Sequence, residues 1–141
     1  MLPSGLPERV DDDEAILRFV FQSNLLSKGQ VKHQAFLPAP LSDKIPRLGT
    51  PVFRHPEEPK EAVRELGPVV LGNRPNKLHG AAVVSAKSVR QASLEIEGDE
   101  PPVRHALILG WAMVDTDPET QKARNMDLAI ALAAAAKFVA L

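Results

Sequence analysis

The stretch Val103-Arg104-His105-Ala106-Leu107-Ile108-Leu109-Gly110-Trp111 decides the fold, because it has the composition of a β-strand with a buried side. A short acidic turn follows, and helical sequence then runs from Pro118 to Ala140. From Leu128 onward Lys137 is the one charged residue. A helix that is apolar all round is buried on more than one side. We therefore expect the sheet with other helices, or a second copy of the protein, to enclose this helix.

The start of this helix has two possible caps. Thr116 with Glu119 has the spacing of a capping box, in which each side chain bonds a free backbone N–H. Asp117 followed by Pro118 fits instead a cap and the first helical position.

The residues before the strand predict the rest of the sheet. Gly80–Ser85 is apolar and small, which favours a strand buried on both faces. Ala86–Ala92 predicts one or two helical turns, and Ser93–Glu97 alternates like a half-exposed strand. A turn over Gly98–Pro102 suits antiparallel neighbours. The predicted class is α+β: a small antiparallel or mixed sheet packed against a long C-terminal helix and one or two other helices.

The first half of the chain is harder to interpret. Over 14–27 an acidic start and helical spacing favour a helix, although Ile16–Phe21 is also good strand sequence. Five prolines predict an irregular segment over 31–56, with one strand at Val31–Leu37 inside it. A helix is expected over Glu57–Leu66, where Gly67-Pro68 would end it.

Composition limits the function classes. The 141 residues predict one domain, here 11–141 after a loose leader at 1–10. A net charge of −1 gives no field that would attract nucleic acid or an anionic membrane. There is no cysteine, which excludes disulfides and thiolate chemistry. No signal peptide is visible, and the apolar run 128–136 is too short to span a bilayer, so we expect a soluble cytoplasmic protein.

Histidines are the candidate chemical groups. His33, His55, His79 and His105 show no metal-binding spacing, so neither a metal nor a cofactor is predicted. On the strand, alternation places His105 on one face with Val103, Leu107, Leu109 and Trp111, at the start of the row expected to point inward. It also lies near the acidic turn of Asp99 and Glu100, and a histidine beside a carboxylate can serve as a general base.

Two groups of residues are candidate sites. His33, His79 and His105 with Arg104 as an anion contact would form a small hydrolase or nuclease site for a phosphorylated substrate. Lys87, Ser88 and Arg90, at the strand-to-helix passage after Ser85, would bind an anion at a helix N-terminus. For each group the alternative is structural: a satisfied histidine at the sheet edge, or a plain serine cap.

Basic residues are concentrated at 15–54 and 66–94, and a shared basic face would bind phosphate. Few aromatic residues accompany them, so nucleic-acid binding is possible but not favoured.

The order of Gln34-Ala35-Phe36-Leu37-Pro38, Leu41-Ser42 and His105-Ala106-Leu107-Ile108-Leu109-Gly110 resembles a pattern in small uncharacterised bacterial proteins carried by phages or integron gene cassettes. The resemblance implies a cytoplasmic accessory protein and no particular activity. Our first hypothesis is a non-enzymatic interaction protein, homodimeric through an apolar helix or sheet surface. The alternative is the hydrolase or nuclease with His105 as general base.

Overall fold

A computed structural model describes residues 2, 4–42, 47–55, 59–73, 77–113 and 116–140. Its elements follow in the order β1 (Ala15–Val20), η1 (Ser23–Leu25), β2 (Leu26–Ser27), β3 (Gln30–Val31), η2 (His33–Phe36), β4 (Ala39–Pro40), β5 (Leu48–His55), α1 (Pro59–Leu71), β6 (Gly80–Ser85), α2 (Ala86–Gln91), β7 (Glu95–Gly98), β8 (His105–Leu109), α3 (Pro118–Ala135) and β9 (Lys137–Ala140). The η elements are short 3₁₀ helices.

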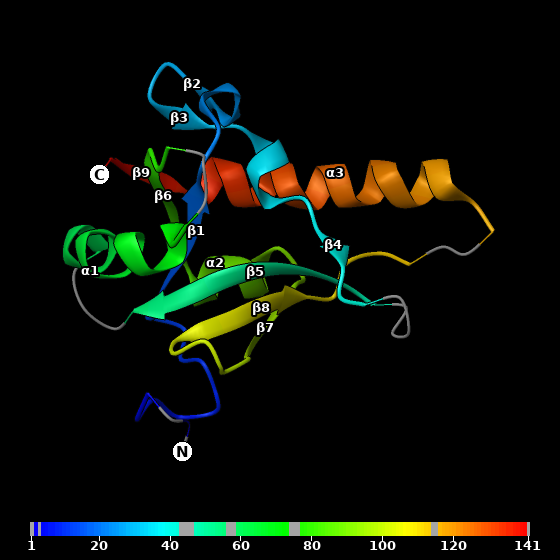
Figure 1. Ribbon diagram of the computed structural model, residues 1–141. Helices are drawn as coiled ribbons and strands as arrows, with labels where there is room; N and C mark the ends of the chain where they lie inside the picture. Colours follow the sequence, from blue (N-terminus) through cyan, green and yellow to red (C-terminus); the bar gives the residue numbers. More distant parts are fainter. Residues whose placement is uncertain are drawn as a thin grey trace.

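The strands confirm the predicted α+β class (Figure 1). The main sheet has the order β7-β8-β5-β1-β6-β9, with β4 added to β5, and each recorded strand pair is antiparallel. A separate hairpin is formed by β2 and β3. In the part of the chain described, no helix is long and apolar enough to cross a membrane.

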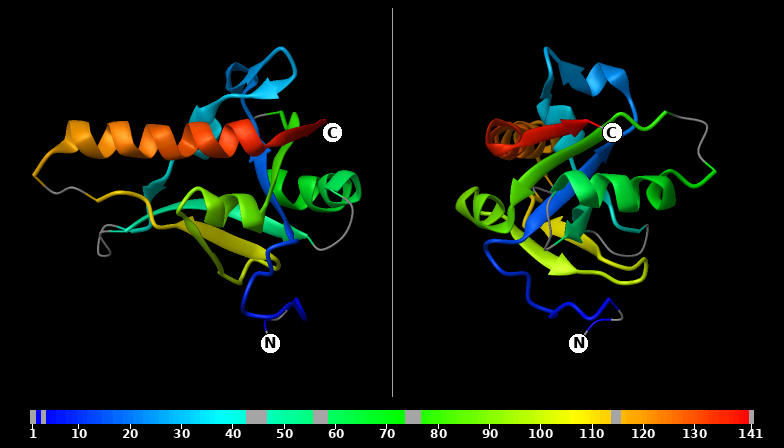
Figure 2. Two further views of the ribbon diagram at one scale, coloured as in Figure 1. Left: turned by 180° about the vertical axis from the view of Figure 1, so that it is seen from behind. Right: turned by 90° about the vertical axis from the view of Figure 1, so that its left-hand side faces the viewer.

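Helices cover both faces of the sheet, as the views in Figure 2 show. On the central strand β1, Ile16 and Val20 belong to the main core with buried residues of α2, α3 and η2. Leu17 and Phe19 point to the opposite face and pack against α1. This alternation is the ordinary pleat of a strand that is buried on both sides.

The prediction of a helix over 14–27 was wrong, and the strand alternative is the one observed. β1 pairs with both β5 and β6, and Ile16, Leu17 and Val20 are fully buried. A central position favours β-branched and aromatic side chains on both faces, so tertiary packing overrides the helical spacing.

β5 was not predicted, because it lies in the proline-rich segment 31–56. Pro51 stands inside this eight-residue strand. Proline is tolerated there because β1 and β5 pair only as far as Leu17 and Phe53, so the missing N–H breaks no bond of that ladder. The strand expected at Val31–Leu37 was also wrong, since η2 occupies most of it.

Helix α1 continues past its expected end. It runs to Leu71 with Gly67 and Pro68 inside it. Its start was expected at Glu57, which lies outside the described residues. Leu66, Val70 and Leu71 pack against the cluster around Leu17 and Phe19, and this burial offsets the cost of proline in a helix.

The C-terminal helix was predicted in the right place but too long. α3 begins after Asp117, whose side chain accepts a hydrogen bond from the Thr120 N–H, and it ends at Ala135. The last residues form β9, which pairs with β6. Within the single chain, the buried residues of α3 form one stripe of Asn125, Ala129 and Leu132, so the sheet and other helices do not enclose it. The alternative, that a second copy covers another side, stays a prediction.

The segment 1–10, expected to be a leader, contacts the domain through its described residues. Ser4 donates to the Glu100 carboxylate from its N–H at 2.9 Å and from its hydroxyl at 2.6 Å. Arg54 donates to the Pro7 carbonyl oxygen at 2.7 Å. Val10 is 1% exposed. These contacts hold the segment against β5 and the β7–β8 turn.

Candidate functional site

His105 begins β8, opposite Phe53 of β5. Its Nδ1 lies 3.1 Å from the Asp99 carbonyl oxygen and 3.2 Å from Asp99 Oδ2, and its ring meets the Phe53 ring edge-on at 5.4 Å between centroids. Because a carbonyl only accepts hydrogen bonds, this geometry places the proton on Nδ1 and makes Nε2 the remaining base nitrogen.

In the row of the 103–111 strand expected to point inward, Leu109 and Trp111 are buried, but the prediction was wrong for Val103, His105 and Leu107. Ala106 and Ile108 are fully buried in the main core, whereas Val103 is 54% exposed. His105 and Leu107 are half-buried on the other face of the sheet. His105 and Leu107 stay half-buried because α2 and α3 cover the Ala106 face, and α1 covers the other face only in part.

His105 lines a cavity of about 620 Å³ between this second face and α1. Its walls are mainly apolar and include Phe19, Phe21, Phe53, Leu66, Val69 and Val70. A pocket of this size with few polar groups has the character of a small-molecule site. The polar side chains in the lining are Arg18 and His105, and none of its described lining residues is acidic.

Arg18 stands where β1 and β5 separate. Its Nε donates to the Ala35 carbonyl at 2.9 Å, and its Nη1 donates to the Pro51 carbonyl at 2.9 Å. The Pro51 carbonyl lies beyond the last β1–β5 pair and the Ala35 carbonyl lies in η2, and the guanidinium supplies a donor to both. Arg18 is thereby held at the wall of the cavity.

The structure places the other predicted catalytic residues as follows. His33 begins η2, and the His79 N–H bonds the Val20 carbonyl at 2.9 Å just before β6. Arg104 has a left-handed backbone with φ of 68°, and its carbonyl accepts from the Arg54 N–H at 2.8 Å. Its Nη1 is buried with no hydrogen-bond partner in the described part of the chain. None of these residues is among those lining the His105 cavity.

The predicted anion-binding residues lie on α2 and are already engaged. Ser88 N–H bonds the Ser85 hydroxyl at 3.0 Å, a serine cap, while the Lys87 side chain is exposed. Arg90 bonds Asp12 at 2.6 Å and Glu95 at 3.1 Å, and the Asp12 carboxylate raises the pKa of Arg90 above its usual value. An anion would have to compete with these carboxylates, and the site remains a prediction.

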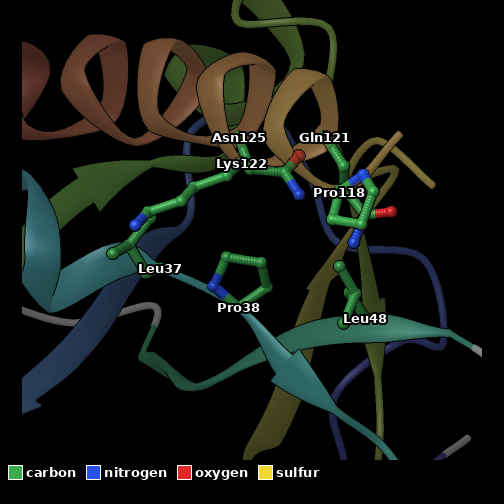
Figure 3. A pocket seen from close by; sticks show the side chains of 7 residues that line it. All are labelled: Leu37, Pro38, Leu48, Pro118, Gln121, Lys122 and Asn125. Carbon is green, nitrogen blue, oxygen red and sulfur yellow. The ribbon is translucent and has the colours of Figure 1, made fainter. Parts of the chain in front are cut away.

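A second cavity of about 490 Å³ lies between α3 and the segment around β4 (Figure 3). Figure 3 shows Lys122, Gln121 and Asn125 of α3 facing Leu37, Pro38 and Leu48 across it. Asn125 accepts from the Ala112 N–H at 2.7 Å and donates to the Ala112 carbonyl at 3.2 Å. Its amide therefore fastens α3 to the end of the β8 segment, and this cavity offers no comparable group for chemistry.

The outward side of α3 carries an apolar stripe. Met126 is 40% and Ile130 is 46% exposed, and Ala123 and Ala134 on the same side are exposed. The spacing of these four residues follows the three-and-four repeat of a helix-packing seam. We call Ala123, Met126, Ile130 and Ala134 the α3 stripe.

Sequence reasoning found His105 but missed Arg18 and the aromatic residues around it. Phe19, Phe21 and Phe53 are three of the five phenylalanines of the chain, and all line one cavity. Their concentration in the segments 16–21 and 48–55 was the available signal. Because 31–56 was interpreted as an irregular proline-rich segment, Phe53 was not considered together with Phe19 and Phe21.

No protein-family model, no curated protein and no solved structure matches this chain. Among the residues described, no group of three or more His, Asp or Glu side chains is arranged to hold a metal ion. The resemblance to proteins of mobile elements therefore stays a prediction.

Proposed function

We propose that this chain is a small accessory protein that works through protein interaction and pairs with a second copy along the α3 stripe. The observation behind the proposal is the exposure of two large apolar side chains, Met126 and Ile130, one turn apart on the outward side of α3. Large apolar side chains that stay exposed in a row commonly mark an interface. Alanines at the flanks allow two helices to approach to about 8–10 Å.

Charge favours a second copy in antiparallel orientation. When Met126 of one copy lies opposite Ile130 of the other, the two helices run antiparallel and the two Glu119 side chains lie at opposite ends of the pair. A parallel pair would instead place Glu119 of one copy beside Glu119 of the other, and the repulsion between the two carboxylates would weaken the dimer.

One helix pair is a modest interface. Stable interfaces bury roughly 1,200–2,000 Å² in total, and a single pair of helices of this length buries less. We therefore expect a reversible dimer with a Kd on the order of 1–100 µM.

Sedimentation velocity over a concentration series tests the proposal. Wild-type protein is expected to pass from monomer to dimer, and Met126→Glu with Ile130→Glu is expected to stay monomeric. Met113→Glu is the matched control, because Met113 is 43% exposed outside α3 and should leave the dimer intact.

Cysteine cross-linking tests the orientation, because the natural chain has no cysteine. In an oxidised mixture, Met126→Cys protein is expected to cross-link to Ile130→Cys protein more than either variant cross-links to itself. Wild-type protein that remains monomeric at millimolar concentration would overturn the proposal, and cross-linking of each variant mainly to itself would overturn the antiparallel arrangement.

The hydrolase or nuclease alternative has less support. Of the catalytic residues proposed from the sequence, His105 lines the cavity, and Arg18 rather than Arg104 is the cation there. Mainly apolar walls suit a phosphorylated substrate poorly, because phosphate requires several hydrogen-bond donors. A cytoplasmic location and an origin among bacterial mobile elements are part of the same proposal of an accessory protein.

A further inference from the structure

The cavity beside His105 differs from the α3 stripe in place and chemistry. It lies on the α1 side of the sheet, whereas α3 packs on the main core side. Its volume of about 620 Å³ is within the range of small-molecule sites. Whatever occupies it is therefore independent of the proposed dimer.

The cavity exists because the sheet opens at this point. β1 and β5 pair from Ala15–His55 to Leu17–Phe53, where the ladder ends, and Pro51, two residues before Phe53 in β5, has no N–H that could extend it. Phe19 and Phe53 meet edge-on at 5.8 Å between ring centroids beside the opening. α1 closes the space from above with Leu66 and Val70, and Val69 at its rim is 74% exposed.

Two polar groups are fixed in this apolar surface. The Arg18 guanidinium is oriented by its bonds to the Ala35 and Pro51 carbonyls. The His105 ring is oriented by Asp99 on Nδ1 and by the edge contact with Phe53. In the described part of the chain Nε2 makes no hydrogen bond that is recorded, so it is the ring nitrogen open to a ligand.

We infer that this cavity binds a small carboxylic acid with an apolar body, such as an aryl-substituted short-chain acid. The carboxylate would lie against the Arg18 guanidinium, whose planar N–H groups match its geometry, with His105 Nε2 beside it. The apolar body would occupy the space between the phenylalanine rings and α1. Because the lining holds no acidic residue among those described, an anion is favoured over a cation.

Isothermal titration with 4-phenylbutyrate tests this, with 4-phenylbutyramide as the uncharged ligand of the same shape. The expected Kd for the acid is on the order of 0.1–1 mM for a ligand of this size. The amide is expected to bind about tenfold more weakly or not at all, because it lacks the charged hydrogen bonds.

Variants locate the site. Arg18→Met is expected to remove the preference for the acid over the amide, and His105→Ala to weaken the acid several-fold. Since Arg18 also bonds backbone carbonyls, its variant is compared with Val69→Trp, which fills the cavity from an exposed position and should block both ligands. Circular dichroism verifies that each variant is folded, and Met126→Glu with Ile130→Glu is expected to bind like wild type.

Equal affinity for acid and amide in wild-type protein would overturn the anion assignment. Absence of heat and of ligand-detected NMR transfer with folded wild-type protein, at about ten times the expected Kd, would overturn the site itself. Binding that survives Val69→Trp unchanged would place the ligand elsewhere and also overturn it.

Discussion

At the residue scale the most consequential contact is the buried pair of Arg54 and Glu14. Arg54 is fully buried, and it donates to the Glu14 carboxylate at 3.0 Å from Nε and at 2.9 Å from Nη2. The same guanidinium also bonds the Pro7 and Arg9 carbonyls. Buried charge is tolerated because each donor has an acceptor.

Glu14→Gln is expected to lower the free energy of unfolding by about 3–5 kcal/mol, since Arg54 would remain buried without its counterion. Urea denaturation at neutral pH measures the change. The double variant Glu14→Leu with Arg54→Met is the control, and its loss is expected to be smaller than the single loss. A double variant that is less stable than Glu14→Gln would contradict this account.

Glu95 predicts a pH dependence of stability. The Ile96 N–H, followed by the Arg90 guanidinium, lowers the pKa of Glu95 below its ordinary value of 4.5 in the folded chain. A lowered folded pKa means that the stabilisation is present above 4.5 and is lost as the pH falls through the folded value. The Glu95 side chain is 59% exposed, so solvent limits the effect to less than about 1 kcal/mol.

Glu95→Gln is therefore expected to lower stability slightly at neutral pH and to make it fall less steeply below pH 4.5. Thermal melts across the acid range measure both effects. Glu97→Gln on the same strand is the matched control, because its pair with Arg47 is longer at 3.9 Å and the carboxylate is 63% exposed. A steeper acid loss in Glu95→Gln than in wild type would refute the assignment.

At the element scale the attachment of β9 to β6 depends on one glycine. Gly80 has a φ of 147°, and a Cβ there would lie 2.2 Å from the Val139 carbonyl oxygen and 2.9 Å from Ala140 Cα. Gly80 pairs with Ala140 in the register of these strands. The end of the sheet therefore requires a residue without a side chain.

Gly80→Ala is expected to cost about 1–3 kcal/mol and to release the last strand. Hydrogen exchange of residues 137–140 should rise, while α3 keeps its protection. Gly29→Ala is the control, since Gly29 has a positive φ of 76° but nothing within 4 Å, and it should bear only the backbone penalty. Unchanged exchange in β9 would show that the strand tolerates the close contact.

At the scale of the whole molecule, the fold leaves the two faces of the sheet unequally covered. α2, α3 and η2 enclose the larger core, while α1 covers the other face and leaves the cavity beside His105 (Figures 1 and 2). The two proposed interactions occur at the surfaces that stay uncovered. A second copy would bind the outer side of α3, and a ligand would bind the cavity beside His105.

Pairing through α3 predicts a Tm that depends on protein concentration, because association stabilises the folded state by mass action. Scanning calorimetry over a hundredfold range of concentration should show the wild-type Tm rising. Met126→Glu with Ile130→Glu should show a constant Tm. A constant wild-type Tm would argue against association of folded chains.

Much of the second half of the fold followed from sequence. The strand at Gly80–Ser85, the helical turns after it and the half-exposed strand around Ser93–Glu97 were confirmed, because the local apolar pattern agrees with the observed burial. β1 and β5 could not be predicted in this way. Their residues are strands because of neighbours brought from elsewhere, and helical spacing and proline content gave the opposite local preference.

By itself the sequence determined the α+β class, a start of α3 within Thr116–Pro118 and the position of His105 near the start of a strand, since these depend on local periodicity and capping. Tertiary structure alone decided which face of the sheet His105 occupies. It also decided that Arg18 and the phenylalanines of β1 and β5 line the same cavity as His105, and that one side of α3 stays exposed. The physical reason is that side chains distant in sequence become neighbours only when the strands pair, and covering a face depends on which helices reach it.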